Sequence, residues 1–463
     1  MAGPAVGIKL KNFFIGIFLF LLSACSPSQR NVEATPSSSP NLPALTSVST
    51  AVSSTLPSGT STPTNTPTPI PTSRGTNIPS WPTQTPLSSI QPGEPFVLTQ
   101  FDMVDENIGW GVEATSHRLR TIDGGSTWKD VTPPEVGFFS AEGDTHAWDV
   151  IQTRISCDQI GCSGGWAPGL VTWHTSDGGQ TWQRGAFFNG GVPEFRPIVM
   201  QFVSDTTGWF LFVDQVGMSG FTFESLVQTL DGGDSWRLIQ PLSNGCLSRG
   251  MIFMNEQDGW IGDDCSGLSN VITGTLWEDF LKGKEVPLLN RTSDGGNTWN
   301  TFALPAPTVF PSNFTSPALD PNVSLYCGIK QMDKMSQMAF TLQWGCKEAD
   351  PGASAKVLYA YLTPDGGQTW HSWLSTGNES FINPDTGWRL FAPGDGQPNS
   401  LQQTADGGLT WRTIKAVAWQ TAQFDFVSEQ VGWAIVSDTM SFALVHTVDG
   451  GKTWIEIKPV IAP

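Results

Sequence analysis

The sequence predicts an all-β fold, a seven-bladed β-propeller whose blades are four-stranded antiparallel sheets. The first observation is the motif T-x-D-G-G-x-[TS]-W, which starts at Thr121 and returns six times. Its copies are at 121–128, 175–182, 229–236, 292–299, 363–370, 404–411 and 447–454. A motif that returns at intervals of tens of residues indicates a repeat architecture. Four-stranded units repeated around an axis form a propeller.

The role of one copy follows from its residues. Asp-Gly-Gly between two strand-forming runs predicts a tight hairpin turn, because glycine adopts the positive φ that such turns require. The carboxylate accepts backbone N–H groups across the loop, and the Trp begins the next strand with a large apolar surface to bury. We therefore expect structural rather than catalytic roles for the seven aspartates: Asp123, Asp177, Asp231, Asp294, Asp365, Asp406 and Asp449.

A second motif, ending in Gly-Trp, precedes the first one in most repeats. It occurs at 105–110, 204–209, 255–260, 383–388 and 428–433, is weaker at Ala147-Trp148, and at 333–338 has Gln337-Met338 instead. A large apolar residue stands seven positions before each Gly-Trp tryptophan: Met103, Phe202, Phe253, Phe381 or Phe426. This spacing predicts strand A, a tight turn, and strand B starting at Gly-Trp. Strands C and D are then joined by the Asp-Gly-Gly turn. The sequence leaves open whether residues 96–98 help to close the ring.

The N-terminus indicates export. Lys9 and Lys11 precede an apolar run, 13–22, that is too short for a confident membrane span. The run ends in Leu22-Ser23-Ala24-Cys25, which resembles the lipobox of bacterial lipoproteins. The resemblance implies that residues 1–25 are a signal peptide. It also implies that Cys25 is lipidated and anchors the exported chain to the outer face of a bacterial membrane, at the cell surface or in the periplasm. An uncleaved anchor gives the same topology.

Residues 26–94 are predicted to be a disordered tether, because Ser, Thr and Pro dominate them and apolar residues are few. Residues 95–463 carry the repeats and form the propeller. Residues 1–94 hold four of the 24 basic and two of the 42 acidic residues, so the propeller has a net charge of −20. Nucleic acid and anionic lipid surfaces are poor partners for such a domain. A basic or weakly charged partner remains open, and we expect a monomer.

Six cysteines follow Cys25, and an even number in an exported chain favours disulfides. They form three pairs that are local in sequence: Cys157 with Cys162, Cys246 with Cys265, and Cys327 with Cys346. Zinc is the alternative, but no C-x2-C pair occurs and the five histidines are scattered. We expect no metal and no cofactor.

The connection lengths point to one functional face. The A–B and C–D turns are nearly constant, whereas the B–C and D–A connections vary and emerge on the opposite face, the usual place for function. Blade 4 carries the largest insertions. We expect ligand-binding residues in these connections: Trp277, Glu278, Asp279, Phe280, Phe310, Phe314, Trp166 and Trp419. Aromatic anchors among polar groups are typical of binding interfaces. The alternative is a structural role, in which a tryptophan in a connection only packs against its own loop.

The two motifs together resemble the BNR, or Asp-box, propeller families, which include sialidases, xyloglucanases and sortilin-type receptors. Over about 96–458 the chain is most similar to the photosystem II stability and assembly factors. That resemblance implies partners in a membrane complex. The same family uses an Arg-rich patch for its partner, whereas the ten arginines of this propeller form no evident cluster in the sequence. The resemblance therefore leaves open whether this chain has a photosynthetic role.

Two functions remain in view. The first is a non-catalytic, lipid-anchored propeller that binds a protein or a glycan. The alternative is a sialidase-like hydrolase, which would need a tyrosine nucleophile. The chain has only Tyr326, Tyr359 and Tyr361, and its Phe195-Arg196-Pro197-Ile198 is a scrambled version of the sialidase F-R-I-P motif. The first function is therefore favoured.

Overall fold

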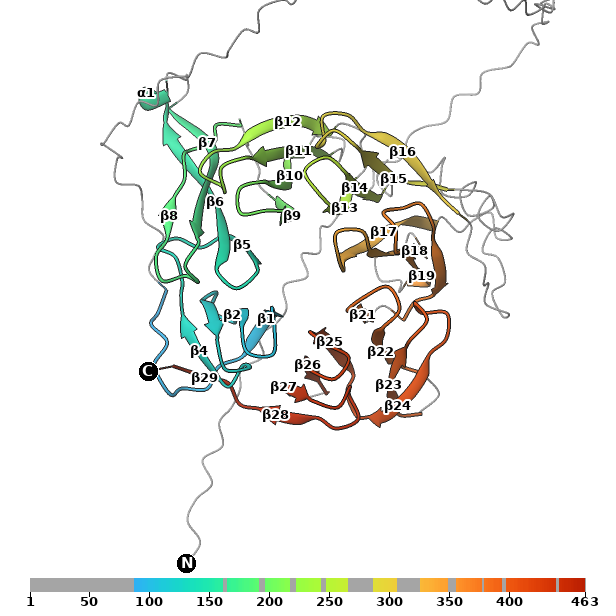
Figure 1. The fold of residues 1–463 in the computed structure, drawn as a ribbon. Helices are drawn as coiled ribbons and strands as arrows, with labels where there is room; N and C mark the ends of the chain where they lie inside the picture. The colour runs from blue at the N-terminus through green and yellow to red at the C-terminus, as the bar shows by residue number, and fades with distance from the viewer. Residues whose placement is uncertain are drawn as a thin grey trace, which may run out of the picture. The chain divides into compact units, whose positions relative to one another are not determined.

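The computed structural model describes residues 87–160, 165–190, 196–216, 222–242, 247–264, 286–305, 325–348, 355–376, 379–393, 397–438 and 441–462. All of them belong to one of the two compact units of the chain, Pro79–Pro463. Seven β-sheets are arranged in a ring (Figure 1). The predicted fold, an all-β propeller with seven four-stranded antiparallel blades, is confirmed. Among the described residues, no helix is long and apolar enough to cross a membrane.

The strands of each blade are consecutive in the sequence, from the innermost strand outward (Figure 1). Blades 1 to 3 consist of β1 (Leu98–Met103), β2 (Gly109–Glu113), β3 (Arg118–Thr121) and β4 (Thr127–Asp130); β5 (Phe138–Glu142), β6 (His146–Ser156), β7 (Trp166–Thr175) and β8 (Gln183–Arg184); and β9 (Arg196–Phe202), β10 (Gly208–Val216), β11 (Thr222–Thr229) and β12 (Arg237–Leu242). The short helix α1 (Cys157–Ile160) follows β6.

The remaining blades repeat this order. Blades 4 to 7 consist of β13 (Leu247–Phe253), β14 (Gly259–Asp264), β15 (Val286–Thr292) and β16 (Asn300–Leu304); β17 (Leu325–Lys334), β18 (Phe340–Glu348), β19 (Ala355–Thr363) and β20 (His371–Leu374); β21 (Glu379–Phe381), β22 (Gly387–Phe391), β23 (Asn399–Thr404) and β24 (Arg412–Val417); and β25 (Thr421–Phe426), β26 (Gly432–Ser437), β27 (Phe442–Thr447) and β28 (Ile455–Ile457). A last strand, β29 (Val460–Ile461), joins blade 1.

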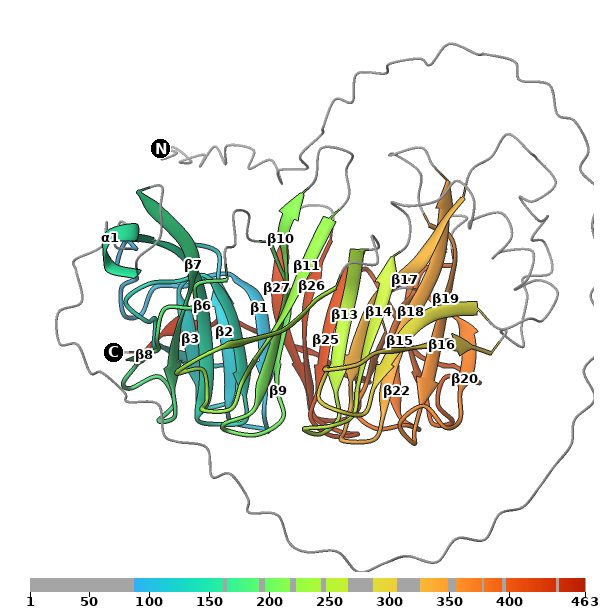
Figure 2. The same ribbon diagram turned by 90° about the horizontal axis from the view of Figure 1, so that it is seen from above.

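The A–B and C–D turns lie on the same face, which we call the Asp-box face. In every blade the N–H of the first motif glycine donates to a carbonyl of the A–B turn, as Gly124 does to Asn107 at 2.9 Å. The opposite face, here the loop face, carries the B–C and D–A connections (Figure 2). The sequence-based assignment of the variable connections to one face is therefore correct.

Blade 5 corrects one sequence prediction. The N–H of Gly366 donates to the carbonyl of Met338, so Met338 lies in the turn. Strand B starts at Phe340, whose register partner is the motif residue Thr363. In five other blades that partner is the glycine of Gly-Trp, as Gly259 is for Thr292, and in blade 2 it is Ala147. The true counterpart of Gly-Trp is thus Phe340-Thr341 and not Gln337-Met338. Spacing alone misplaced it because neither marker residue is present.

A cross-strand rule explains the Gly-Trp glycine. In five blades it lies directly opposite the large apolar residue of strand A, as Gly432 lies opposite Phe426. A Cβ on Gly432 would come within 2.3 Å of the Phe426 ring. The two exceptions change both members of the pair. Blade 2 has Ala141 opposite Ala147, and blade 5 has Lys334 opposite Phe340.

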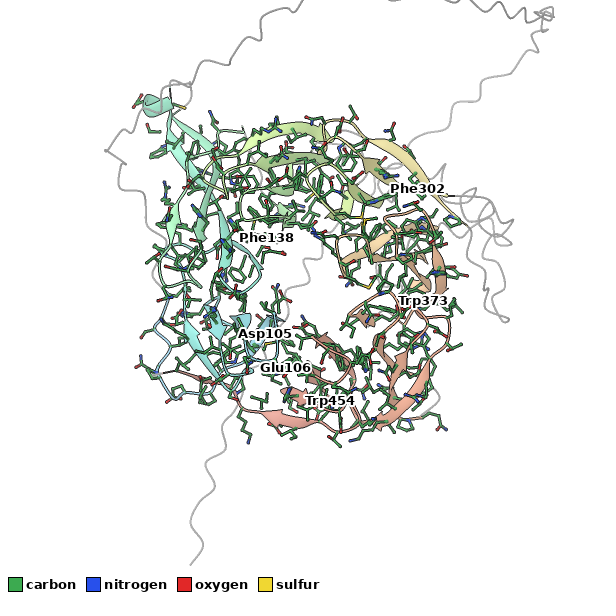
Figure 3. The ribbon with its side chains drawn as sticks, viewed as in Figure 1. Asp105, Glu106, Phe138, Phe302, Trp373 and Trp454 are labelled. Atoms are coloured by element: carbon green, nitrogen blue, oxygen red, sulfur yellow. The ribbon has the colours of Figure 1, made fainter. Side chains whose placement is uncertain are left out.

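The Gly-Trp tryptophans join neighbouring blades. Trp433 of blade 7 donates its indole N–H to the carbonyl of Gly124 in blade 1, at 2.9 Å, which connects the last blade to the first. The same bond to the first motif glycine of the next blade is made by Trp148, Trp209 and Trp388. The strand A phenylalanine of the next blade covers the indole, as Phe426 stacks on Trp388 at 3.6 Å. Side chains fill the wall of the ring between the strands (Figure 3).

The C-terminal strand closes the ring, which the sequence left open. β29 pairs in parallel with β4, so that Ile461 is opposite Trp128. On its other side Pro95 forms a bridge with Val460. Two further backbone bonds, from Gly93 N–H to the Ile461 carbonyl at 2.9 Å and from Ile461 N–H to Glu94 at 3.3 Å, complete the pairing. The chain end thus lies between blade 1 and the segment that enters it.

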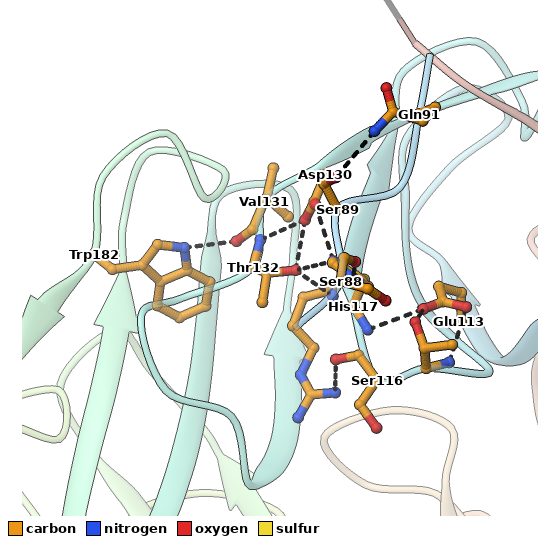
Figure 4. A network of polar contacts seen from close by, with 12 residues as sticks. Ser88, Ser89, Gln91, Glu113, Ser116, His117, Asp130, Val131, Thr132 and Trp182 are labelled. Atoms are coloured by element: carbon orange, nitrogen blue, oxygen red, sulfur yellow. Dashed lines mark hydrogen bonds and ion pairs between the residues drawn. The ribbon is translucent and has the colours of Figure 1, made fainter. Parts of the chain in front are cut away.

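Residues 88–95, which we call the N-terminal strap, lie along blade 1 (Figure 4). One ring nitrogen of the buried His117 is 2.9 Å from the carbonyl oxygen of Ser88. Its other ring nitrogen is 3.0 Å from a carboxylate oxygen of Asp130. The last residues of the segment assigned to the tether are therefore held against the propeller. The tether prediction for 26–86 lies outside the described residues, as does the signal peptide with Cys25.

Candidate functional site

The Asp-box carboxylates are committed to their own turns. In blade 2, Asp177 Oδ1 accepts the Thr175 hydroxyl at 2.8 Å and the Thr181 N–H at 2.9 Å, and Oδ2 accepts the Thr181 hydroxyl at 2.6 Å. The same three bonds recur in all seven boxes, with Ser235 in place of Thr in blade 3. The Thr181 bonds lower the pKa of Asp177 to about 2. Each of these carboxylates therefore accepts three hydrogen bonds within its own turn, which stabilises the turn.

Most predicted loop-face residues lie outside the described residues: Trp277, Glu278, Asp279, Phe280, Phe310 and Phe314. The other two differ in their surroundings. Trp166 starts β7 at the loop face and is 60% exposed. Trp419 is half-buried, edge-on against Trp454 at 5.4 Å, and its carbonyl accepts the Asn399 side chain at 2.7 Å. Trp419 thus packs as a residue that pins its connection, while Trp166 is free to contact a partner.

Two further exposed aromatics were not among the predicted binding residues. Phe223 on β11 is 41% exposed, and Phe442 at the start of β27 is 69% exposed. Both are near the loop-face end of strand C, as Trp166 is in blade 2. A large apolar residue at the start of strand C, next to a B–C connection, is the sequence signal that would have found them.

The cysteines are described in part. Cys157 is disulfide-bonded, and its expected partner, Cys162, lies outside the described residues. Cys327 and Cys346 are register partners on β17 and β18. Cys246 and Cys265 also lie outside the described residues. The three pairings therefore stay predictions. Among the described residues, no group of three or more His, Cys, Asp or Glu side chains is placed to hold a metal ion.

Two of the three tyrosines are unsuited to nucleophilic chemistry. Tyr359 and Tyr361 are fully buried on β19. Burial raises the pKa of Tyr359 to about 12 and also raises the pKa of Tyr361, whose hydroxyl donates to the carbonyl of Pro305 at 2.9 Å. A phenol held neutral in a core is a poor nucleophile. Arg196, of the F-R-P-I segment, begins β9 and is exposed.

Carboxylates gather at the central channel. The position just before the large apolar residue of strand A is equivalent in all blades, and we call it the ring position. It holds Asp102, Ser140, Gln201, Ile252, Asp333, Ser380 and Asp425. Because strand A ends at the A–B turn, this ring lies toward the Asp-box face. Six of the seven residues line hollows of the channel.

Asp425 is the most perturbed of these acids. Its Oδ2 accepts the Met103 N–H of the neighbouring blade at 2.5 Å. Burial, and then the nearby charge of Asp102, raise its pKa to about 7. Gln201 makes the corresponding contact in blade 3, where its amide both accepts the Phe253 N–H and donates to the Phe253 carbonyl. A neutral Asp425 resembles that amide, because it carries one donor and one acceptor.

Burial also raises the pKa of three other channel acids, Asp102, Asp333 and Glu142. Asp102 and Asp333 are both exposed to solvent, and both line one hollow of the channel. Lys334 is the opposing cation. Burial lowers the pKa of Lys334, against the attraction of Glu142. In the part of the channel that the structure describes, acids of raised pKa therefore lie near the Lys334 ammonium group, and perturbed groups of this kind are enriched at functional sites.

We expect Asp425→Asn to increase the free energy of unfolding at pH 8 by on the order of 2 kcal/mol. The folded pKa of about 7 exceeds the unfolded value of 3.8, so this carboxyl costs stability as the pH rises between those values. The variant keeps the acceptor for Met103 without the charge. Urea unfolding at pH 5 and pH 8 measures the difference. Asp385→Asn, at an exposed A–B turn, is the control, and an equal response of both variants would contradict the expectation.

No protein-family model matches this chain, and no curated protein matches it. Solved structures of other proteins do match this chain. YCF48 bound to a D1 peptide is 15% identical over 79% of this chain and 96% of that one, with a TM-score of 0.43. A GH74 xyloglucanase from Xanthomonas campestris is 10% identical over 80% and 54%, with a TM-score of 0.45. A PL25 ulvan lyase is 11% identical over 68% and 81%, with a TM-score of 0.36. Binding and catalytic propellers are both represented, and likeness at this level carries no functional argument.

Proposed function

We propose that this chain is a non-catalytic propeller that acts as a binding or assembly scaffold, with a protein or glycan partner held on the loop face. The difference between the two faces carries the proposal. The Asp-box face repeats one saturated turn seven times, so it offers little that is specific to a partner. The loop face carries connections of different length in every blade, and specificity resides in such variation.

Exposed aromatic side chains support this assignment. Trp166, Phe223 and Phe442 are near the loop-face ends of strand C in blades 2, 3 and 7. Each would bury a large apolar surface only against another molecule or a connection of its own chain. Aromatic anchors of this kind supply most of the binding energy at interfaces.

A photo-crosslinking amino acid distinguishes the faces. We expect a crosslinker at position 166 or 442 to form adducts with the partner in the native cells. The matched control is position 122, in the x position of the first Asp box, which is equally exposed at 66%. Adducts from position 122 but not from 166 or 442 would place the partner on the Asp-box face and overturn the proposal.

Export and anchoring are the second part of the proposal. The lipobox-like Leu22-Ser23-Ala24-Cys25 supports lipidation at Cys25, which would tether the propeller to the outer face of a bacterial membrane. We expect Cys25→Ala to remain an unprocessed and unlipidated precursor. Mass spectrometry of the membrane fraction measures this, with Ser23→Ala, a change to another small residue, as the processed control. Normal maturation of Cys25→Ala would refute the lipobox.

A glycan-cleaving function is the second candidate, and one observation favours it. Asp102 and Asp425 are interacting carboxyls of raised pKa beside the channel, and glycosidases use paired carboxyls as acid and base. Hydrolysis or lyase assays on a panel of polysaccharides test it. Activity that Asp425→Asn abolishes and Asp385→Asn retains would establish catalysis in place of the scaffold function.

A further inference from the structure

The strand A residues of the two exceptions to the cross-strand rule, Ala141 and Lys334, line hollows of the channel. In blade 5 the aromatic ring has moved to strand B, where Phe340 lies 5.9 Å from Trp260 of blade 4 and covers it. Because Phe340 covers Trp260, the side chain at position 334 is not needed for the contact between blades 4 and 5. Lys334 lines two hollows of the channel instead. In blade 2 the small Ala141 lines a third hollow beside Trp110. The two positions that depart from the cross-strand rule thus both lie at hollows of the channel wall.

One of these hollows has an apolar wall. It has a volume of about 590 Å³ and is lined by Met200, Met251, Met254, Met332 and Met335. These residues come from blades 3, 4 and 5 and lie on one side of the channel, near the A–B turns. Methionine side chains are flexible and polarizable, and they adapt to aliphatic groups of different shape. Such a wall suits an apolar stem and contributes nothing to a hard metal ion.

The charge of the same space is strongly negative. Asp333 and Glu142 line the methionine hollow, and Asp102 and Asp333 line the adjoining one of about 430 Å³. Among the described residues, neither Asp102, Glu142 nor Asp333 has a basic nitrogen within 4.0 Å. Among the described lining residues Lys334 is the one cation, so the three acids outnumber the basic groups there. Another acid that lines the adjoining hollow, Glu379, already pairs with Arg389 at 4.0 Å.

We propose that the Asp-box end of the channel is a second binding site, which accepts the side chain of a lysine or arginine from a partner protein. The aliphatic stem lies along the methionine wall, and the charged end meets Asp333, Glu142 and Asp102. Both halves of the site are required, because a stem alone gains no charge contact and a bare cation gains no apolar burial. This site is on the opposite face from the loop-face surface and is independent of it.

The test uses the full mature chain with 13C-labelled methionine methyl groups and three probes of equal length: n-hexylammonium, hexan-1-ol and hexanoate. We expect n-hexylammonium to shift the methyl signals of Met332 and Met335 in a saturable manner. Met338, half-exposed in the A–B turn and outside the hollow, serves as the unshifted reference. The alcohol should bind about tenfold more weakly, the loss of one charge contact, and hexanoate should not bind. The peptide acetyl-Lys-Leu-Lys-Leu-amide should shift the same methyl groups, whereas its Gln analogue should not.

Two variants decide whether the acids take part. Asp333→Asn should weaken n-hexylammonium binding about tenfold, and Asp102→Asn should weaken it in the same direction. Asp385→Asn removes the same charge from an exposed turn and should bind like the wild type. The methyl spectrum reports in each case that the chain is folded. Equal affinity for the ammonium and the alcohol, equal weakening in Asp385→Asn, or no shift at Met332 and Met335 would each overturn the proposal. None of these outcomes bears on adducts formed from position 166.

Discussion

Replacing Gly432 with phenylalanine is expected to lower the free energy of unfolding by on the order of 3 kcal/mol. The cross-strand partner Phe426 occupies the space, and even a Cβ on Gly432 would come within 2.3 Å of its ring. Neither side chain can withdraw, because Phe426 is stacked on Trp388 at 3.6 Å. Overpacking at this joint therefore strains two blades at once.

The chain itself suggests the rescue. Blade 5 has lysine on strand A and phenylalanine on strand B at the same pair of positions, Lys334 and Phe340. We expect the double variant Phe426→Lys, Gly432→Phe to be more stable than either single variant. Phe426→Lys alone should lose on the order of 3 kcal/mol, since it uncovers Trp388. In the double variant the new ring on strand B covers Trp388, as Phe340 covers Trp260.

A double-mutant cycle from urea unfolding measures the coupling. The expected coupling energy is favourable and on the order of 2 kcal/mol. Ile455→Ser, at an exposed position of the same blade, is the control for a polar substitution that disturbs no packing. If the losses in free energy of unfolding were simply additive in the double variant, the idea would be wrong. A lysine–phenylalanine pair, as in blade 5, could then not replace the phenylalanine–glycine pair of blade 7.

The repeat architecture was predictable because each Asp box is built from local contacts. The bonds of Asp177 reach residues two and four positions away, so the motif specifies its turn without help from the rest of the chain. The blade count and the two faces follow from that. The predicted register of blade 5 was wrong for the converse reason. The residues that mark the start of strand B are selected by contacts with strand A and with the neighbouring blade, and not by their own turn. Where Lys334 and Phe340 exchange roles, a single-strand pattern has nothing to match.

The acidic channel was missed although a signal was present. Asp102, Asp333 and Asp425 each stand immediately before the large residue of strand A or its replacement, one equivalent position in three blades. That shared position was the signal, since the net charge of the propeller alone does not separate these acids from the others. Their raised pKa values depend on burial by neighbouring blades and on the meeting of blades 7 and 1, which no local pattern encodes.

Ring closure by β29 leads to the second large effect. Removing residues 459–463 is expected to lower the free energy of unfolding by on the order of 4 kcal/mol. The truncation deletes the buried Ile461, which is 4% exposed, and uncovers the outer edge of β4. It also breaks four backbone bonds, including those of Gly93 and Glu94 in the N-terminal strap.

The point variants Ile461→Ser and Val460→Ser separate packing from backbone pairing. Ile461→Ser should reproduce much of the loss, because its side chain packs with Trp128 and Leu98. Val460→Ser, at a half-buried position, should cost much less. Hydrogen exchange should show the N-terminal strap released together with β4 in the truncated chain, since β29 lies between them. Urea unfolding at the same denaturant concentration as the full chain would instead mean that the Trp433–Gly124 bond between blades 7 and 1 holds the ring without its last strand.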